Sequence, residues 1–131
     1  MSSQPDTDST QPSVQRASNN QAAFIHDSRE HEELIRVFGE VDLSNEDEFE
    51  GALARLCGLH RPVVVDLTSC TYMDSSGFHI LERMSKRAEL RLIARERGGV
   101  HKLFEVLNAD KFLTIQYVND STLRVVAQEA R

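Results

Sequence analysis

Short apolar runs alternate with longer amphipathic segments over residues 23–130. PVVVDL at 62–67 is an unbroken run rich in β-branched residues, which predicts a strand buried on both faces, and LRLIA at 90–94 predicts a second one. LIRVFGEVD at 34–42 mixes apolar and polar positions at strand spacing, so it predicts a strand that ends or bends at Gly39. AFIHD at 23–27 and TIQYV at 114–118 are shorter strand candidates.

Helices are predicted between and after these strands. Ser44 is the expected N-cap of the first helix, which has acidic residues in its first turn and ends near Gly58. Apolar residues recur at helical spacing over 80–88 and again over 100–107. Ser121 is expected to cap a closing helix.

This alternation of strands and helices indicates the α/β class. A chain of 131 residues is long enough for one domain with a core of its own. We therefore expect a single domain over residues 23–131, with a mixed, mostly parallel sheet of about four to five strands covered by about four helices. Residues 1–22 are rich in Ser, Gln, Asn, Thr and Pro, which predicts a disordered N-terminal tail.

Composition narrows the function classes. The formal net charge of −6 argues against a general nucleic-acid binder, because phosphate contacts need clustered Lys and Arg. No apolar run approaches the roughly 20 residues that span a bilayer, and the N-terminus lacks the apolar core of a signal peptide. A cytoplasmic location is the resulting expectation, and it agrees with Cys57 and Cys70 being free thiols. No metal-ligand spacing and no cofactor motif is present.

The segment TSCTYMDSSG, residues 68–77, carries the most suggestive chemistry. It follows the strand expected to end near Leu67 and opens a helix near Ser75, so it lies where sites form in α/β domains. Two interpretations stay open at this point. The polar residues are only the cap of a helix, or else Ser75 or Ser76 is a phosphate acceptor or contact site, whose added charge a helix N-terminus tolerates.

Enzymatic use of this segment has little support. It does not match the G-x-S-x-G of a nucleophile elbow, and no G-x-x-x-x-G-K-[ST] loop is present to bind ATP or GTP. Asp74 with Asp42 or Asp66 would be the candidate carboxylate pair, although solvated acids are the more common explanation for such residues. We expect a protein that is not an enzyme and that has no catalytic residues.

VVVDLTSCTYMDSSGFHIL, residues 63–81, resembles the central segment of the STAS domain family, especially the anti-sigma factor antagonists of bacteria. FGEVDLSNEDEFEGAL, residues 38–53, is similar to the family's G-E-x-D followed by a helix. The resemblance extends over most of residues 24–130 and implies the STAS fold.

The resemblance also implies a function. The family's phosphate acceptor falls on Ser75, and its partner is an anti-sigma factor with an ATP-binding serine kinase domain. The unphosphorylated antagonist binds that kinase and so frees a sigma factor; a phosphatase restores Ser75. The implied partner-binding residues are Asp42, Asp74, Ser75, Ser76, Gly77, Phe78 and His79. STAS domains also serve as scaffold subunits of stress-signalling assemblies and as regulatory subunits of transporters, which is the alternative function.

One stretch departs from the family pattern. Phe78 and His79 stand where the family usually has a small or aliphatic pair after the glycine. His79 is then either a solvent-facing helix residue or a contact specific to one partner. The departure bears on which kinase is recognised.

Overall fold

Six strands form one sheet in the computed structural model, which describes residues 12–119. The strands lie in the order in which they occur along the chain: β1 (Ser13–Arg16), β2 (Ala22–Ser28), β3 (Glu33–Val41), β4 (Val63–Met73), β5 (Leu90–Arg95) and β6 (Thr114–Val118). The first three strands pair antiparallel, and β3 to β6 pair in parallel. The sheet is therefore mixed and mostly parallel, as predicted.

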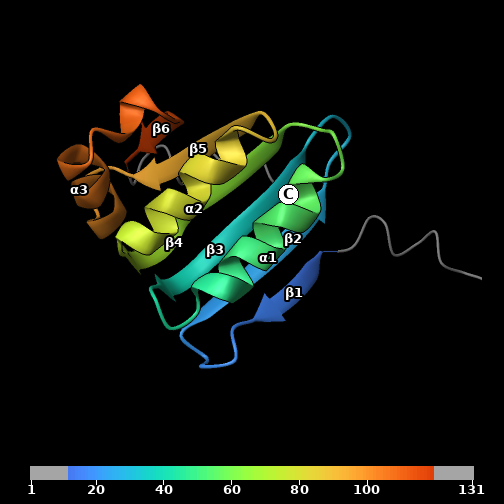
Figure 1. Cartoon of the computed structure of the whole chain (residues 1–131), viewed down its shortest axis with the longest axis horizontal. Helices are drawn as coiled ribbons and strands as arrows, with labels where there is room; N and C mark the ends of the chain where they lie inside the picture. The colour runs from blue at the N-terminus through green and yellow to red at the C-terminus, as the bar shows by residue number, and fades with distance from the viewer. Residues whose placement is uncertain (1–11, 120–131) are drawn as a thin grey trace, which may run out of the picture.

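Helices α1 (Glu46–Cys57) and α2 (Ser75–Ser85) lie side by side on one face of this sheet (Figure 1). The shorter α3 (Gly99–Val106) and the single 3-10 turn η2 (Ala109–Lys111) follow β5. Each parallel strand is thus connected to the next by a helical segment, which confirms the α/β class. The core lies between helices and sheet, and its most buried members include Val37, Leu53, Val65, Leu81 and Phe104. The predicted helix after Ser121 lies outside the described residues.

The N-terminal segment differs from the expectation for residues 1–22. Ser13–Arg16 forms β1, which pairs antiparallel with β2 as an added edge strand, so part of the segment expected to be a tail belongs to the sheet. An edge strand can pair through backbone hydrogen bonds without burying a face. The sequence of β1, SVQR, can therefore have a single apolar residue. Ala17 and Ala22 at the ends of the following turn are buried. Residues 1–11 are outside the described part.

The start of α1 and the end of β4 also differ from the boundaries predicted from the sequence. The N-cap of α1 is Asn45 and not Ser44, because the Ser44 hydroxyl donates to the Asp42 carboxylate instead. Strand β4 continues past Leu67 to Met73, since its second half goes on pairing with β3 after two register shifts. The segment expected to be a loop is therefore mostly strand, and only Asp74 separates β4 from α2.

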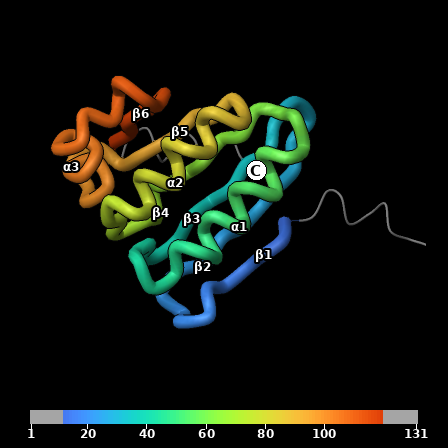
Figure 2. Tube along the Cα trace, in the orientation of Figure 1, coloured from blue at the N-terminus to red at the C-terminus, as the bar shows by residue number. Residues whose placement is uncertain are grey.

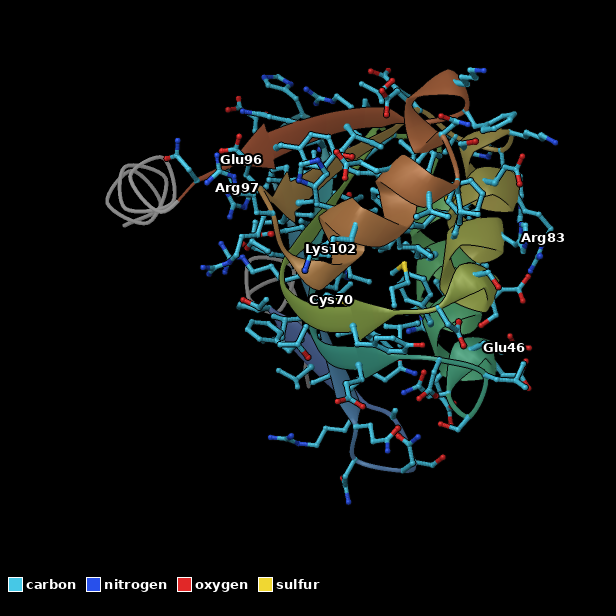
Figure 3. The ribbon with its side chains drawn as sticks, turned by 90° about the vertical axis from the view of Figure 1, so that its left-hand side faces the viewer. Glu46, Cys70, Arg83, Glu96, Arg97 and Lys102 are labelled. Atoms are coloured by element: carbon cyan, nitrogen blue, oxygen red, sulfur yellow. The ribbon has the colours of Figure 1, made fainter. Side chains whose placement is uncertain are left out.

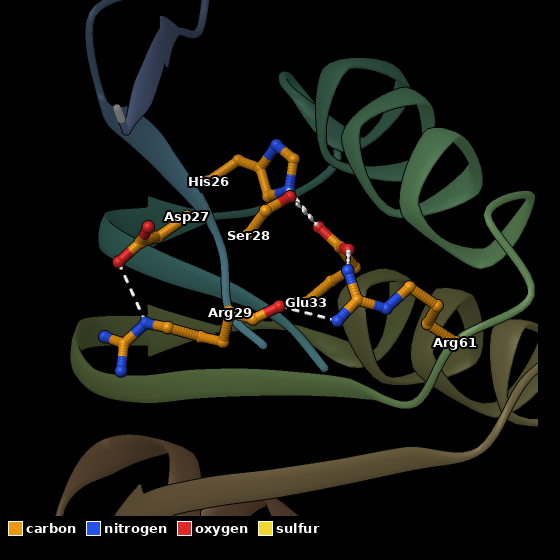
Figure 4. A network of polar contacts seen from close by, with 6 residues as sticks. All are labelled: His26, Asp27, Ser28, Arg29, Glu33 and Arg61. Carbon is orange, nitrogen blue, oxygen red and sulfur yellow. Dashed lines mark hydrogen bonds and ion pairs between the residues drawn. The ribbon is translucent and has the colours of Figure 1, made fainter. Parts of the chain in front are cut away.

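A buried glutamate stabilises the end of the sheet where β3 begins (Figure 4). The side chain of Glu33 is 1% exposed and accepts hydrogen bonds from Ser28 and Arg61, each at 2.6 Å, with His26 Nε2 also 2.6 Å away. Arg61 precedes β4, so this network ties β2, β3 and the segment before β4 together. It lies at the amino ends of the parallel strands, opposite the end that leads into α2.

Candidate functional site

The N-terminus of α2 is capped by Asp74. Its Oδ1 accepts from the backbone N–H of Ser76 at 3.0 Å, from the N–H of Gly77 at 3.3 Å and from the Ser76 hydroxyl at 2.5 Å. The first turn of a helix has N–H groups without helical partners, and a carboxylate there also meets the positive end of the helix dipole. The capping role predicted for this segment belongs to Asp74 and leaves the function of the serines open.

The two serines are in different states. Ser75 is the first residue of α2, is exposed, and its hydroxyl makes no hydrogen bond to any residue from 12 to 119. Ser76 is half-buried, and its hydroxyl is committed to the Asp74 carboxylate. A reaction at the Ser75 hydroxyl therefore leaves the helix cap intact, whereas the same reaction at Ser76 would disrupt the cap.

The loop between β3 and α1 meets α2 at this point. The second carboxylate oxygen of Asp74 accepts from the backbone N–H of Leu43 at 3.1 Å, and the Asp74 N–H donates to the carbonyl of Val41 at 3.1 Å. Asp42, the neighbouring acid, accepts from the Ser44 N–H at 2.9 Å. The ends of β3 and β4 thus bring Asp42 and Asp74 into adjoining segments, which the peptide of Leu43 connects.

Buried Asn45 fixes the shape of this loop from beneath. The residue is 1% exposed, and its Oδ1 accepts from the Asp42 N–H at 3.0 Å. Its Nδ2 donates to the carbonyl of Glu40 at 2.9 Å. A buried amide with both ends paired holds the backbone in one conformation. The sequence suggested a cap at Ser44, and it contained no signal for this bracing role of Asn45.

Gly77 allows α2 to lie against the sheet. A Cβ at this position would lie 2.6 Å from Met73 Cγ and 3.3 Å from Val41 Cγ1, so a larger residue fits only if the helix or Met73 is displaced. Gly77 and Phe78 are both buried. These two residues of the predicted partner-binding set therefore shape the surface from below, and present no exposed side chain.

His79 lies one helical turn after Ser75 on the same face of α2. Its side chain is 58% exposed, with Nδ1 3.5 Å from Glu82 Oε1. Arg83 continues the face a turn later, points outward (Figure 3), and forms an ion pair with Glu50 of α1 at 2.9 Å. The exposed face of α2 thus presents Ser75 and His79 to solvent.

Three large apolar side chains are exposed around this end of the molecule. Leu43 is 72% exposed in the β3–α1 loop, Tyr72 is 49% exposed near the end of β4, and Phe112 is 53% exposed. Phe112 reaches α2 through a ring contact with Phe78, centroid to centroid 6.4 Å. None of the three was predicted from the sequence, because the exposure of a side chain depends on how distant segments pack around it. Large exposed apolar side chains are common at protein contact surfaces.

The described residues around Ser75 include no base that contacts its hydroxyl. Within residues 12–119 no His or carboxylate hydrogen-bonds to Ser75, and no group of three or more His, Cys, Asp or Glu is placed to hold a metal ion. Cys57 and Cys70 are free and buried, as predicted. Burial raises the pKa of the Cys70 thiol to about 11, so it is protonated at neutral pH.

The sequence model of the STAS domain matches residues 27–122. This chain belongs to the STAS domain family. The match covers β3, β4 and α2, which carry the site, and it begins inside β2, so β1 and the turn after it lie outside the matched region. None of the curated protein sequences matches the chain significantly.

Solved structures share this STAS fold. An anti-sigma factor antagonist from Mycobacterium paratuberculosis is 17% identical with a TM-score of 0.71, over 85% of this chain and 98% of that one. The anti-sigma factor antagonist SpoIIAA in its unphosphorylated form is 17% identical with a TM-score of 0.58, over 81% and 96%. The Bacillus cell fate determinant SpoIIAA in its phosphorylated form is 14% identical with a TM-score of 0.54, over 82% and 99%. At these identities the likeness concerns the fold.

No helix among residues 12–119 is long and apolar enough to cross a membrane.

Proposed function

We propose that this STAS domain is an anti-sigma factor antagonist that is switched off by phosphorylation of Ser75. Unphosphorylated, it binds an anti-sigma factor with an ATP-binding serine kinase domain and so releases a sigma factor. The observation that carries the proposal is the state of the Ser75 hydroxyl, which is exposed at the start of α2 while the Ser76 hydroxyl is engaged in the cap. A kinase can reach Ser75 without unfolding any part of the described chain.

The helix N-terminus supports a phosphate at Ser75. A phosphoserine carries a charge of about −1.5 to −2, and the dipole of a helix N-terminus favours negative charge. Asp74 already accepts from the N–H groups of Ser76 and Gly77, so the cap persists beside the new group. We therefore expect phosphorylation to leave the fold unchanged.

The effect of the phosphate is expected at the interface. The loop that carries exposed Leu43 bonds to Asp74, next to Ser75 in the chain, and exposed His79 follows Ser75 by one helical turn. A partner that covers this surface has to desolvate the phosphate, and an unpaired buried charge costs several kcal/mol. That cost corresponds to a loss of affinity of about a hundredfold or more. The switch would thus operate through local charge and sterics.

The residues around Ser75 agree with a substrate rather than an enzyme. The chain has no phosphate-binding loop motif, so ATP and Mg²⁺ would come from the kinase. The reaction transfers the γ-phosphoryl group to the Ser75 oxygen, with the hydroxyl proton and ADP leaving on the kinase side. A phosphatase would hydrolyse the phosphoserine and return the protein to its binding form.

Phosphorylation in vitro tests the proposal. The purified protein is incubated with ATP, Mg²⁺ and, one at a time, the anti-sigma factor kinase domains of its source organism, and the intact mass is measured. We expect one added phosphate, mapped by fragmentation to Ser75. Ser75→Ala should remain unmodified, whereas Ser76→Ala is the matched control and should still accept the phosphate. Modification of Ser76 alone would refute the assignment to Ser75. The absence of any modification with every kinase tested would refute it as well.

A further inference from the structure

The turn that joins β1 to β2 contacts the loop that carries Asp42 and Leu43. The side-chain Nδ2 of Asn19 donates to the Ser44 hydroxyl oxygen at 2.7 Å, and the Ser44 hydroxyl donates in turn to Asp42. A continuous series of hydrogen bonds therefore starts in the N-terminal turn and ends at Asp42 in the β3–α1 loop, and the peptide N–H of the next residue, Leu43, bonds to Asp74. In the Cα trace the turn and the loop lie side by side (Figure 2).

The backbone makes a second connection between these segments. The carbonyl of Gln21 accepts from the Glu40 N–H at 2.8 Å, and it lies so close to β3 that a Cβ at Gly39 would be 2.1 Å from it. Gly39 has a φ of +88°, which is favourable only for glycine. The family resemblance accounts for the G-E-x-D motif, while the structure supplies a local reason for its glycine, namely the approach of the N-terminal turn.

The turn itself is well anchored. Ala17 and Ala22 at its ends are 2% and 5% exposed and hydrogen-bond to each other through their backbones at 2.9 Å. The Oδ1 of Asn19 accepts from the Gln21 N–H at 3.0 Å, which closes the turn. Ser18 adds a hydrogen bond to Glu48 of α1 at 2.8 Å. A turn held at both ends can restrain the loop that it contacts.

We propose that Asn19 is a positioning residue for the partner-binding surface around Ser75. Its amide bonds to the hydroxyl of Ser44, which in turn bonds to Asp42. These two bonds fix the peptide of Leu43 against Asp74 and present the exposed Leu43 side chain beside α2. This inference rests on the proposed function and deepens it: the surface that receives the kinase domain includes the N-terminal turn. The turn precedes the residues that the family model matches, which begin at residue 27.

Amide hydrogen exchange on the full-length protein tests the positioning without any partner. Loss of one neutral hydrogen bond changes a local opening equilibrium by about twofold to tenfold. In Asn19→Ala the Leu43 amide should therefore exchange about twofold to tenfold faster than in the wild type. Ser18→Ala is the matched control, since it removes a hydrogen bond of the same turn to α1 and leaves Asn19 and Ser44 in place; its Leu43 amide should exchange at the wild-type rate.

A double-mutant cycle identifies the path. If the effect passes through the hydroxyl of Ser44, then Asn19→Ala combined with Ser44→Ala should exchange no faster at Leu43 than Ser44→Ala alone. Additive effects of the two substitutions would show that Asn19 acts by another route and would overturn the assignment. An unchanged Leu43 rate in Asn19→Ala would overturn it as well.

Binding is measured with the kinase domain that phosphorylates the wild type. Asn19→Ala should bind it about threefold to tenfold more weakly, and Ser18→Ala should bind as the wild type does. Faster exchange at Leu43 together with unchanged affinity would exclude the turn from the binding surface. If no kinase domain phosphorylates the wild type, the proposed function fails, and the exchange measurement still decides whether Asn19 positions the loop.

Discussion

Asp74 Oδ2 accepts a hydrogen bond from the backbone N–H of Leu43 at 3.1 Å, while its Oδ1 caps α2. One carboxylate thus joins the loop after β3 to the helix after β4. The two segments are 31 residues apart in the sequence and meet next to Ser75. This contact explains how the position of α2 and the shape of the neighbouring loop depend on each other.

Substitution of Asp74 separates its two roles. Asp74→Ala removes the cap and the acceptor for Leu43, so the free energy of unfolding should fall by about 1.5–3 kcal/mol. Asp74→Asn keeps one oxygen for the cap and lacks the second, so it should lose only about 0.5–1.5 kcal/mol. Urea unfolding of both variants measures the difference. Wild-type stability in Asp74→Ala would contradict the capping role.

Two glycines in helices should respond oppositely to alanine. At Gly77 an added Cβ meets Met73 Cγ at 2.6 Å, so Gly77→Ala should destabilise the protein by about 1–3 kcal/mol despite the better helix propensity of alanine. At Gly51 of α1 nothing lies within 4 Å of the added Cβ, so Gly51→Ala should stabilise it by about 0.5–1 kcal/mol. Melting curves of the pair provide the comparison. A stabilising Gly77→Ala would show that α2 does not lie against Met73.

Acid should weaken the network around Glu33. Burial raises the pKa of this carboxyl, but hydrogen bonds from Ser28 and His26 and the charges of His26 and Arg61 outweigh burial, so the pKa is lower than usual. A lowered pKa in the folded state means that the unfolded state binds more protons as the pH falls. The stabilisation is therefore complete above about pH 5 and is lost as the pH falls through the lowered pKa.

Glu33→Gln tests this pH dependence. At about pH 7 the variant should be less stable than the wild type by about 1.5–3 kcal/mol, and the difference should shrink toward about pH 3. The control is Glu32→Gln, whose partner Arg91 is 49% exposed, so that the change costs at most about 1 kcal/mol. The free energies of unfolding of the wild type and both variants are measured at several pH values. If the difference between Glu33→Gln and the wild type stays constant across this range, the ionisation of Glu33 does not contribute to stability as proposed.

The fold was largely predictable because its signals are local. The run PVVVDL predicted β4, capping and first-turn signals predicted α1, and helical spacing of apolar residues predicted α2 and α3. Strand β1 was missed because SVQR pairs through its backbone and buries almost nothing, so it leaves no hydrophobic pattern. The extension of β4 to Met73 was missed for a related reason, since it depends on pairing with β3 across two register shifts.

The candidate site was predictable only in part. The segment from Asp74 to Gly77 stood out in the sequence, and the structure places it at a helix N-terminus where the strands β3 and β4 end. The assignment of the phosphate to Ser75 stays a prediction. The contributions of Asn19 and Leu43 arise from contacts between segments far apart in the chain, and no local pattern indicates such contacts.

The central claim is that charge at position 75 acts on the interface and leaves the fold unchanged. Ser75→Asp adds a charge of about −1 at a helix N-terminus, where negative charge is favourable by about 0.3–1 kcal/mol. The kinase domain has to desolvate that charge when it binds. Ser75→Ala is the matched neutral variant, and it removes only a hydroxyl that makes no hydrogen bond to residues 12–119.

Calorimetric titration of Ser75→Asp and Ser75→Ala with the kinase domain, beside the melting curves of both variants, is the most direct test. We predict melting temperatures close to that of the wild type for both, and an affinity weaker by about tenfold or more for Ser75→Asp than for Ser75→Ala. Equal affinities of the two variants, or a melting temperature of Ser75→Asp lowered by many degrees, would contradict a switch that operates at the interface.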